Sequence, residues 1–274
     1  MKNDEVKAIT ERLEKGVKDL FESASYRDYL ACMSKFYNYS FNNTLLIFMQ
    51  CPAASLVAGF RKWETEFSRH VKKGEKSIKI LAPCPHKVEK EVVNPDGTKE
   101  TKEIRFTTYR PVSVFDISQT EGKPLPEIPC KTLSGNVDGF PETFERVKSF
   151  SPVPVSFEDI ANGANGYYSL AEKRIAIKNG LSEEQTLKTL IHEIAHAVLH
   201  DKDTGTAKET DRATKEVQAE SVAFTVCAAL GLDTSDYSFG YVAGWSTGKD
   251  AKELTASMEV IRTTAKSILD GIAA

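Results

Sequence analysis

The spacing of apolar residues predicts helices in the first fifty positions. Apolar side chains recur every three or four residues at the start of the chain, which is the repeat of one helix face, so we expect an amphipathic helix over residues 4–21. Its apolar positions are Val6, Ile9, Leu13, Val17 and Leu20. A second helical pattern begins near Tyr26 and continues through the aromatic and amide-rich segment YNYSFNN to Leu46 and Ile47.

The pattern changes after Pro52. The segments that follow are short, rich in β-branched residues and partly alternating, as is typical of strands. They read SLVAGF, SIKILAP, KVEKEVV, EIRFTTY and RPVSVFD. The sequence NPDG at residues 94–97 is a turn signal between two of them, so we expect a β-hairpin around Asp96.

A linker is expected near residue 130. Gly122, Pro124, Pro126 and Pro129 lie close together, and this combination interrupts both helices and strands. We therefore expect two domains, residues 1–130 and residues 131–274.

Helical patterns dominate the second half. A helix is expected over residues 141–149, a strand over RIAIK at 174–178, and a long helix after Ser182, which forms a capping box with Gln185. Two further helices are expected over about residues 211–230, where Gly231 ends the helix, and over about residues 251–272. The predicted fold class is α+β, with a mixed α/β front domain followed by a mainly helical domain that holds a small sheet.

Composition excludes several classes of protein. Apolar residues make up 41% of the 274 residues and charged residues 27%, which excludes collagen-like, coiled-coil and wholly disordered chains. The longest apolar stretches, such as residues 45–49, are far shorter than a membrane-spanning helix, and no secretory signal is seen. We expect a cytoplasmic protein with no membrane partner and with its five cysteines reduced.

Charge is distributed unevenly. The formal net charge of −3 combines +3 through Cys130 with −6 after it, and residues 61–90 hold nine basic against four acidic side chains. This is a weak indication of a front half that faces anions.

The segment from His192 to His196 reads HEIAH, an HExxH motif within the expected long helix. Residues four apart lie on one helix face, so both imidazoles are able to bind one tetrahedral ion. Glu193 then lies beside the ion, where a carboxylate is able to accept the proton of a metal-bound water. Packed, hydrogen-bonded histidines are the alternative interpretation.

A third metal ligand is expected from the next helix. Glu216 and Glu220 are four residues apart beside small apolar residues, a place where a carboxylate needs a counter-charge. The residues alone leave open which of the two would be the ligand. A solvated helix face, with pairing to Lys215 or Arg212, is the alternative.

HEIAH followed by the ExxAE pattern of residues 216–220 resembles the zincin metallopeptidases of the polyvalent and ImmA/IrrE-like kind. The resemblance implies one Zn²⁺ per chain, with other divalent metals possible, a peptide or protein substrate, Glu216 as third ligand and Glu220 as the partner of a histidine. Tyr168, or its neighbour Tyr167, is by the same resemblance a candidate donor to the oxyanion, with core packing as the alternative. His200 is expected to be structural, and the RIAIK strand to accept an extended peptide by strand addition.

The first half resembles the single-stranded-DNA-binding domain of ArdC-like antirestriction proteins through YSFNNTLLIFMQCPAASLVAGFRKW and HVKKGEKSIKILAP. Ser68 and Ser77 stand where we would expect glycines. Single strands are bound by cations and stacking rings. The candidate DNA-binding residues are Tyr39, Asn42, Asn43, Arg61, Lys62, Trp63, Arg69, Lys72, Lys73 and Lys76. Solvated lysines and core aromatics are the alternative.

Two functions from different classes follow. The first is a zinc metallopeptidase joined to a nonspecific single-stranded-DNA-binding domain, in an antirestriction or conjugation context. The second is a DNA-binding protective protein whose zinc domain is a scaffold without proteolytic activity. A repressor-processing regulator without DNA contact is a third hypothesis.

Overall fold

The computed structural model describes residues 2–22, 25–93, 99–125, 139–161, 163–201, 210–237 and 239–273. Its chain begins with three helices, α1 (Lys2–Glu22), α2 (Tyr26–Lys35) and α3 (Phe41–Gln50). The first helix is confirmed. The single helix that we expected from Tyr26 to Ile47 is wrong: the Ser40 backbone is extended, and its hydroxyl accepts a hydrogen bond from Asn43 N, which starts a separate helix α3.

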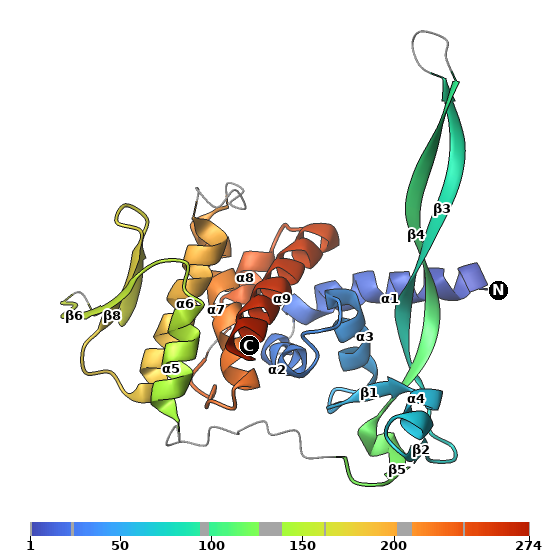
Figure 1. Ribbon diagram of the computed structural model, residues 1–274, viewed down its shortest axis with the longest axis horizontal. Coiled ribbons are helices and arrows are strands. Elements are labelled where there is room, and N and C mark those ends of the chain that lie inside the picture. Colours follow the sequence, from blue (N-terminus) through green and yellow to red (C-terminus); the bar gives the residue numbers. More distant parts are fainter. Residues whose placement is uncertain are drawn as a thin grey trace.

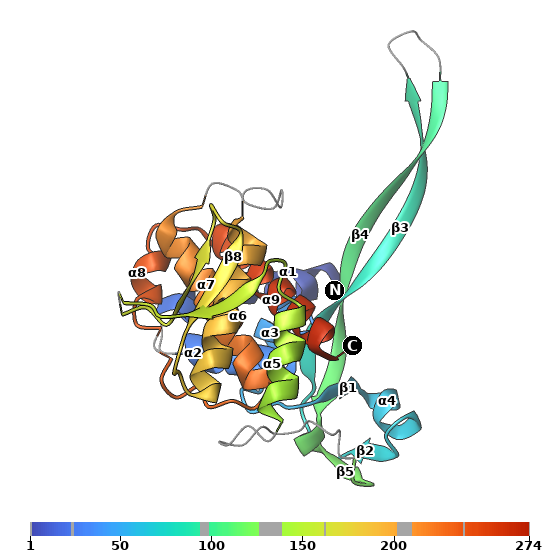
Figure 2. The ribbon, with the colours of Figure 1, turned by 60° about the vertical axis from the view of Figure 1, so that its left-hand side comes forward.

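A long two-stranded arm is the most conspicuous element of the first half (Figure 1). Strand β3 (Ile78–Val93) pairs antiparallel with β4 (Lys99–Asp116) along its whole length, and the short β1 (Val57–Gly59) pairs with the base of β4. Val93 is in register with Lys99, which confirms the predicted hairpin, although its turn at 94–98 lies outside the described residues. The several short strands that we expected there are instead two long ones. The arm extends away from the helices in both views (Figures 1 and 2).

A small lobe surrounds the base of the arm. It contains α4 (Phe60–Thr65), β2 (Arg69–Val71), the 3₁₀ helix η1 (Ile117–Gln119) and β5 (Thr120–Gly122), with β2 and β5 antiparallel. Ser68 adopts a left-handed φ of 53°, a region that glycine occupies more easily. Serine at this position therefore preserves a glycine-like turn at some cost in strain.

The second half begins with α5 (Phe140–Ser149) and a small sheet of β6 (Val155–Glu158), β7 (Gly166–Ser169) and β8 (Arg174–Lys178). The sheet order is β6-β8-β7, with β6 parallel and β7 antiparallel to β8. The RIAIK strand is confirmed as β8. However, β8 is the central strand and is paired on both sides, so strand addition to RIAIK is wrong; β6 and β7 are the two edge strands.

After the sheet, the described residues form four helices: α6 (Glu183–His200), α7 (Arg212–Ala229), α8 (Val242–Ser246) and α9 (Ala251–Ala273). Gly231 follows α7 with φ 77°, as expected of a helix-ending glycine. Among the described residues, no helix is long and apolar enough to cross a membrane. The predicted α+β class, with a mainly helical second half and a small sheet, is confirmed.

The two halves share one hydrophobic core. Helix α2 packs on α7, and α9 packs on α7, α1 and α3. The buried Tyr26 hydroxyl is 2.8 Å from Ser221 Oγ, which joins α2 to α7. The expected boundary near residue 130 lies outside the described residues. Helix α7 is thus packed directly against a helix of the first half.

Candidate functional site

Helix α6 carries the HExxH motif on a face turned toward α7. Ser182 caps the helix by accepting a hydrogen bond from Gln185 N at 3.2 Å, while the Gln185 side chain donates to Thr189 instead of completing the capping box. Buried apolar side chains hold the opposite face of α6 in the core. They are Leu187, Leu190, Ile191, Ile194 and Ala197.

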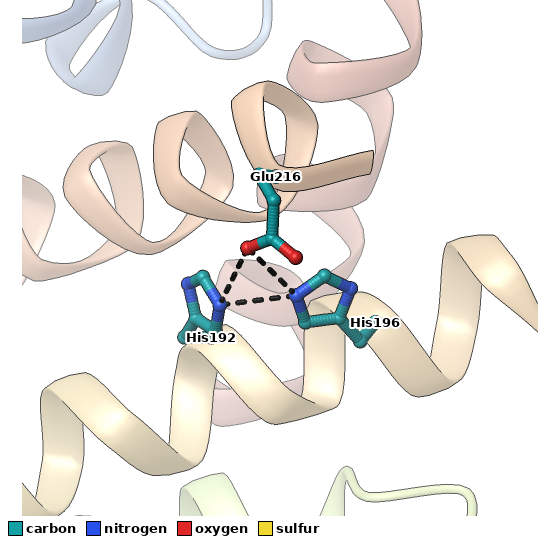
Figure 3. A group of neighbouring side chains, drawn as sticks. All are labelled: His192, His196 and Glu216. Carbon is teal, nitrogen blue, oxygen red and sulfur yellow. Dashed lines mark hydrogen bonds and ion pairs between the residues drawn. The ribbon is translucent and has the colours of Figure 1, made fainter. Parts of the chain in front are cut away.

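His192, His196 and Glu216 converge (Figure 3). The Nε2 atoms of the two histidines are 3.0 Å apart, and Glu216 Oε2 lies 3.8 Å from His192 Nε2 and 3.7 Å from His196 Nε2. Ligands about 2.1 Å from a tetrahedral ion are ~3.4 Å apart, so these separations fit a divalent ion. The structure thus brings together His192, His196 and Glu216, the ligand set that the family resemblance implies.

The remaining nitrogen of each imidazole has a partner. His192 Nδ1 is 3.1 Å from Glu220 Oε2, and His196 Nδ1 is 2.9 Å from His200 Nδ1. Both Nε2 lone pairs are therefore able to face the same point, which is what a metal site requires. In this geometry Glu216 faces the candidate ion position, and Glu220 faces the back of His192.

The pKa values of two acidic side chains of the site are shifted in opposite directions. The neighbouring His196 imidazole, 3.7 Å from the Glu216 carboxylate, is the chief reason that the pKa of Glu216 lies below its ordinary value of 4.5. Burial raises the pKa of Glu193, although both imidazoles and a backbone hydrogen bond from Tyr168 act in the opposite direction. Burial also lowers the pKa of His200 to about 4, so this ring is neutral at pH 7.

Two open cavities adjoin His192. One, of about 500 Å³, is lined by Tyr168, Leu170, His196, Arg212 and Glu216 among others. The second, of about 240 Å³, is lined by Lys188, Glu220 and Asp236 among others. Gly166, His192 and Glu193 line both cavities, so a cleft passes the candidate metal centre beside strand β7.

Gly166 allows β7 to approach α6 closely. A Cβ there would lie 2.5 Å from Thr189 Cγ2 and 2.9 Å from the Ala176 carbonyl oxygen. Only glycine leaves β7 at this distance from the helix that bears Glu193.

The tyrosine candidates have other partners. The Tyr168 hydroxyl donates to Asp201, which also accepts from Lys173 Nζ at 2.6 Å, and the Tyr167 hydroxyl donates to Glu158. Because these hydroxyl protons are engaged by carboxylates, neither tyrosine fits the expected oxyanion donor in this arrangement. Tyr168 contributes its backbone to Glu193 instead.

Three candidate DNA-binding residues are built into the fold. Trp63 is fully buried and donates from Nε1 to the Phe115 carbonyl at 2.9 Å, so it is unable to stack on a base. Asn43 pairs with both backbone groups of Leu81, accepting at 2.8 Å and donating at 2.9 Å. Tyr39 is half-buried against Phe36, and its hydroxyl donates to the Val57 carbonyl.

Arg69 also has a structural role. Its guanidinium donates to Thr120 Oγ1 and to the carbonyls of Thr120, Gly122 and Lys123, which fastens β2 to β5. Lys62 is 3.2 Å from Glu66, and Lys72 donates to the Ser118 carbonyl. The remaining candidates are solvent-exposed: Asn42, Arg61, Lys73 and Lys76.

Sequence reasoning missed the exposed aromatic residues of the first half. Phe60 is 49% exposed beside Arg61, and Tyr109 on the arm is 55% exposed. In the FRKW segment we expected Trp63 to be the exposed ring, and this is wrong. Phe60 starts α4 and faces solvent, whereas Trp63 lies one turn later and faces the core. Alternation along β4 was the only available signal for Tyr109.

The fold and the site together define a zincin-like domain preceded by a mixed α/β segment. Residues 3–115 match the family model described as the N-terminal domain of anti-restriction factor ArdC, and residues 151–264 match the IrrE N-terminal-like domain of the Peptidase_M78 family. The chain thus combines an ArdC-type N-terminal domain with an IrrE-like domain, and its resemblance to ArdC-like proteins is confirmed.

A curated relative and two solved structures are similar to this chain over most of its length. The uncharacterized protein pXO2-81 of Bacillus anthracis is 29% identical over 93% of this chain, which spans about half of that relative, 48% of its length. The metal-free crystal structure of the antirestriction protein ArdC from plasmid R388 is similar with a TM-score of 0.57 at 19% identity, over 93% of this chain and 98% of that one. The Mn(II)-bound structure of the same protein gives 0.53 at 20% identity, over 86% and 85%. These structures show the shared fold.

Proposed function

We propose that this chain is a zinc-dependent metallopeptidase joined to a nonspecific single-stranded-DNA-binding segment, acting in antirestriction or in the transfer of a mobile element. The convergence of His192, His196 and Glu216 from two helices carries the proposal, because two imidazoles and a carboxylate that leave one position open form a catalytic zinc donor set. The match to the ArdC N-terminal domain supports the DNA-binding part.

Each polar residue of the site has an assigned role. His192, His196 and Glu216 hold the ion, and Glu220 orients His192 through Nδ1. A divalent ion there would lower the pKa of a coordinated water and polarise a peptide carbonyl. Glu193 accepts a proton from the attacking water and gives it to the leaving amine of the peptide. Its position in the wall of both cavities supports this role.

The edge of β7 that faces away from β8 is the proposed peptide-binding edge. It borders the cleft at Gly166 and Tyr168, and an extended peptide added to this edge would pass Glu193. Backbone pairing of this kind tolerates many side chains. We therefore expect a broad sequence range on the strand side of the cleft.

The exposed basic residues of the small lobe are the proposed DNA contacts. Arg61, Lys73 and Lys76 are exposed and are the proposed phosphate contacts, and Phe60 replaces Trp63 as the ring available for stacking. Lys62 and Lys72 lie on the same lobe with their cations near the surface.

Metal content, cleavage and DNA protection test the proposal together. The purified chain is expected to bind about one zinc, and Glu193→Gln is expected to keep the metal and lose cleavage of a peptide library. Glu145→Gln, an exposed change on α5, is the matched control. A chain without bound metal defeats the site. If Glu193→Gln still protects DNA from restriction, protection does not require cleavage. That result would favour the alternative, a DNA-binding protective protein whose zinc domain is a scaffold.

A further inference from the structure

Four side chains from three helices form a hydrogen-bonded row behind the candidate metal centre. His196 Nδ1 is 2.9 Å from His200 Nδ1, His200 Nε2 is 3.1 Å from Gln218 Oε1, and Gln218 Nε2 is 3.1 Å from Ser257 Oγ. His200, Gln218 and Ser257 are all buried. The row therefore links α9, through α7, to a candidate ligand on α6.

The amide of Gln218 gives the row a direction. Its nitrogen only donates, so Ser257 accepts, and its oxygen only accepts, so His200 carries a proton on Nε2. An imidazole that binds a metal through Nε2 carries its proton on Nδ1, so in the 2.9 Å contact His196 Nδ1 donates and His200 Nδ1 accepts. His196 Nε2 is then left with a free lone pair, on the side of the ring that faces Glu216.

The opposite direction is incompatible with metal binding. If the amide were rotated by half a turn, its nitrogen would donate to His200 Nε2, and His200 would donate from Nδ1 to His196. His196 would then carry its proton on Nε2, where no metal could bind. One amide orientation therefore decides whether His196 is a ligand.

The other candidate ligand lacks such a row. His192 Nδ1 faces the Glu220 carboxylate directly, which accepts in either orientation. The site thus holds one imidazole by a charged group and the other by a neutral chain of groups. Gln218 lies on the same helix as Glu216, so α7 provides both a ligand and the support of another ligand.

We propose that His200, Gln218 and Ser257 are positioning residues that hold His196 in the tautomer that binds the metal. The inference rests on the proposed role of His196 as a ligand. Gln218 is the decisive member, because it alone sets the direction of the protons.

Zinc affinity, measured by competition with a chelator on the full chain, tests the inference. Gln218→Met keeps the volume and removes both hydrogen bonds, and it is expected to weaken zinc binding about 10–100-fold, as is usual for the loss of such partners. Gln218→Glu still accepts from His200 and is expected to bind within about threefold of wild type. Thr264→Val, a buried change on α9 outside the row, is the control.

Two further readouts separate positioning from stability. Substituted with cobalt(II), Gln218→Met is expected to show an altered visible spectrum, whereas Thr264→Val keeps the wild-type spectrum. ¹⁵N NMR of the zinc-loaded wild type is expected to place protons on His200 Nε2 and His196 Nδ1. That second measurement stands even where Gln218→Met fails to fold.

The outcomes distinguish the two proposals. Wild type that binds no zinc defeats the proposed metal site and this inference with it. Wild type that binds zinc and loses it on Glu216→Gln, while Gln218→Met binds as tightly as wild type, defeats this inference alone. The opposite histidine tautomers by NMR also overturn it.

Discussion

Glu220 Oε2 lies 3.1 Å from His192 Nδ1, on the side of the imidazole opposite to Nε2. The sequence left open whether Glu216 or Glu220 would be the third ligand, because both lie on one face of α7. Glu216 lies on the Nε2 side of the His192 ring and Glu220 on its Nδ1 side, so Glu216 is the expected ligand and Glu220 the expected partner of His192.

Substitution of the two carboxylates is therefore expected to give unequal losses. Glu216→Gln removes a charged donor next to both Nε2 atoms and is expected to abolish stoichiometric zinc binding. Glu220→Gln keeps an acceptor for His192 Nδ1 and is expected to weaken binding about 10–100-fold. Zinc titration of both variants against a chelator is the measurement. Equal losses, or a larger loss for Glu220→Gln, would reverse the assignment.

Trp63 is expected to matter for stability and not for DNA contact. Trp63→Ala removes a fully buried ring and the hydrogen bond to Phe115, and such truncations cost about 3–5 kcal/mol. Urea unfolding is the measurement. Phe60→Ala, which removes an exposed ring on the same helix, is expected to change unfolding by less than about 1 kcal/mol and to weaken binding of single-stranded DNA. Both expectations would be contradicted if a folded Trp63→Leu variant bound single-stranded DNA more weakly than wild type while Phe60→Ala bound it equally well.

Local patterns predicted most elements and the HExxH face, because helix and strand periods and the i, i+4 spacing depend on nearby residues alone. The Glu216 and Glu220 roles required the packing angle of α7 on α6, which no local pattern contains. Trp63 and Asn43 were misread for a similar reason: their partners, Phe115 and Leu81, lie far along the chain. The sequence shows which side chains are able to stack or bind, and tertiary contacts decide which are free to do so.

Asp116 is expected to make stability depend on acid pH. Burial raises the pKa of this carboxyl, but hydrogen bonds from Ser118, Ser55 and Leu56 outweigh it, and the pKa lies below the ordinary value of 3.8. A lowered pKa in the folded state stabilises the fold above pH 3.8, and that contribution disappears as the pH falls through the folded-state pKa.

Unfolding free energies of wild type and Asp116→Asn between pH 3 and pH 7 measure this contribution. Above about pH 5 the variant is expected to be less stable by about 1.5–3 kcal/mol, the range for hydrogen bonds to charged groups. The difference is expected to narrow below pH 3.8. A difference that stays constant with pH would show that the Asp116 charge is not responsible.

Lys73 and Lys76 are expected to contribute to the salt dependence of DNA binding. Both are exposed, and among the described residues no ion pair or hydrogen bond of their side chains is found. Each phosphate contact on a single strand contributes ~0.7 to the slope of log K against log salt concentration. Replacing both lysines with glutamate is thus expected to reduce that slope by about 1.4 and to leave urea unfolding almost unchanged. Fluorescence anisotropy with oligo-dT at several salt concentrations measures it. Lys15→Glu with Lys18→Glu makes the same charge change on exposed positions of α1 and is the matched control. If both double variants lower the slope equally, binding follows the net charge of the chain and the small lobe is not the DNA surface.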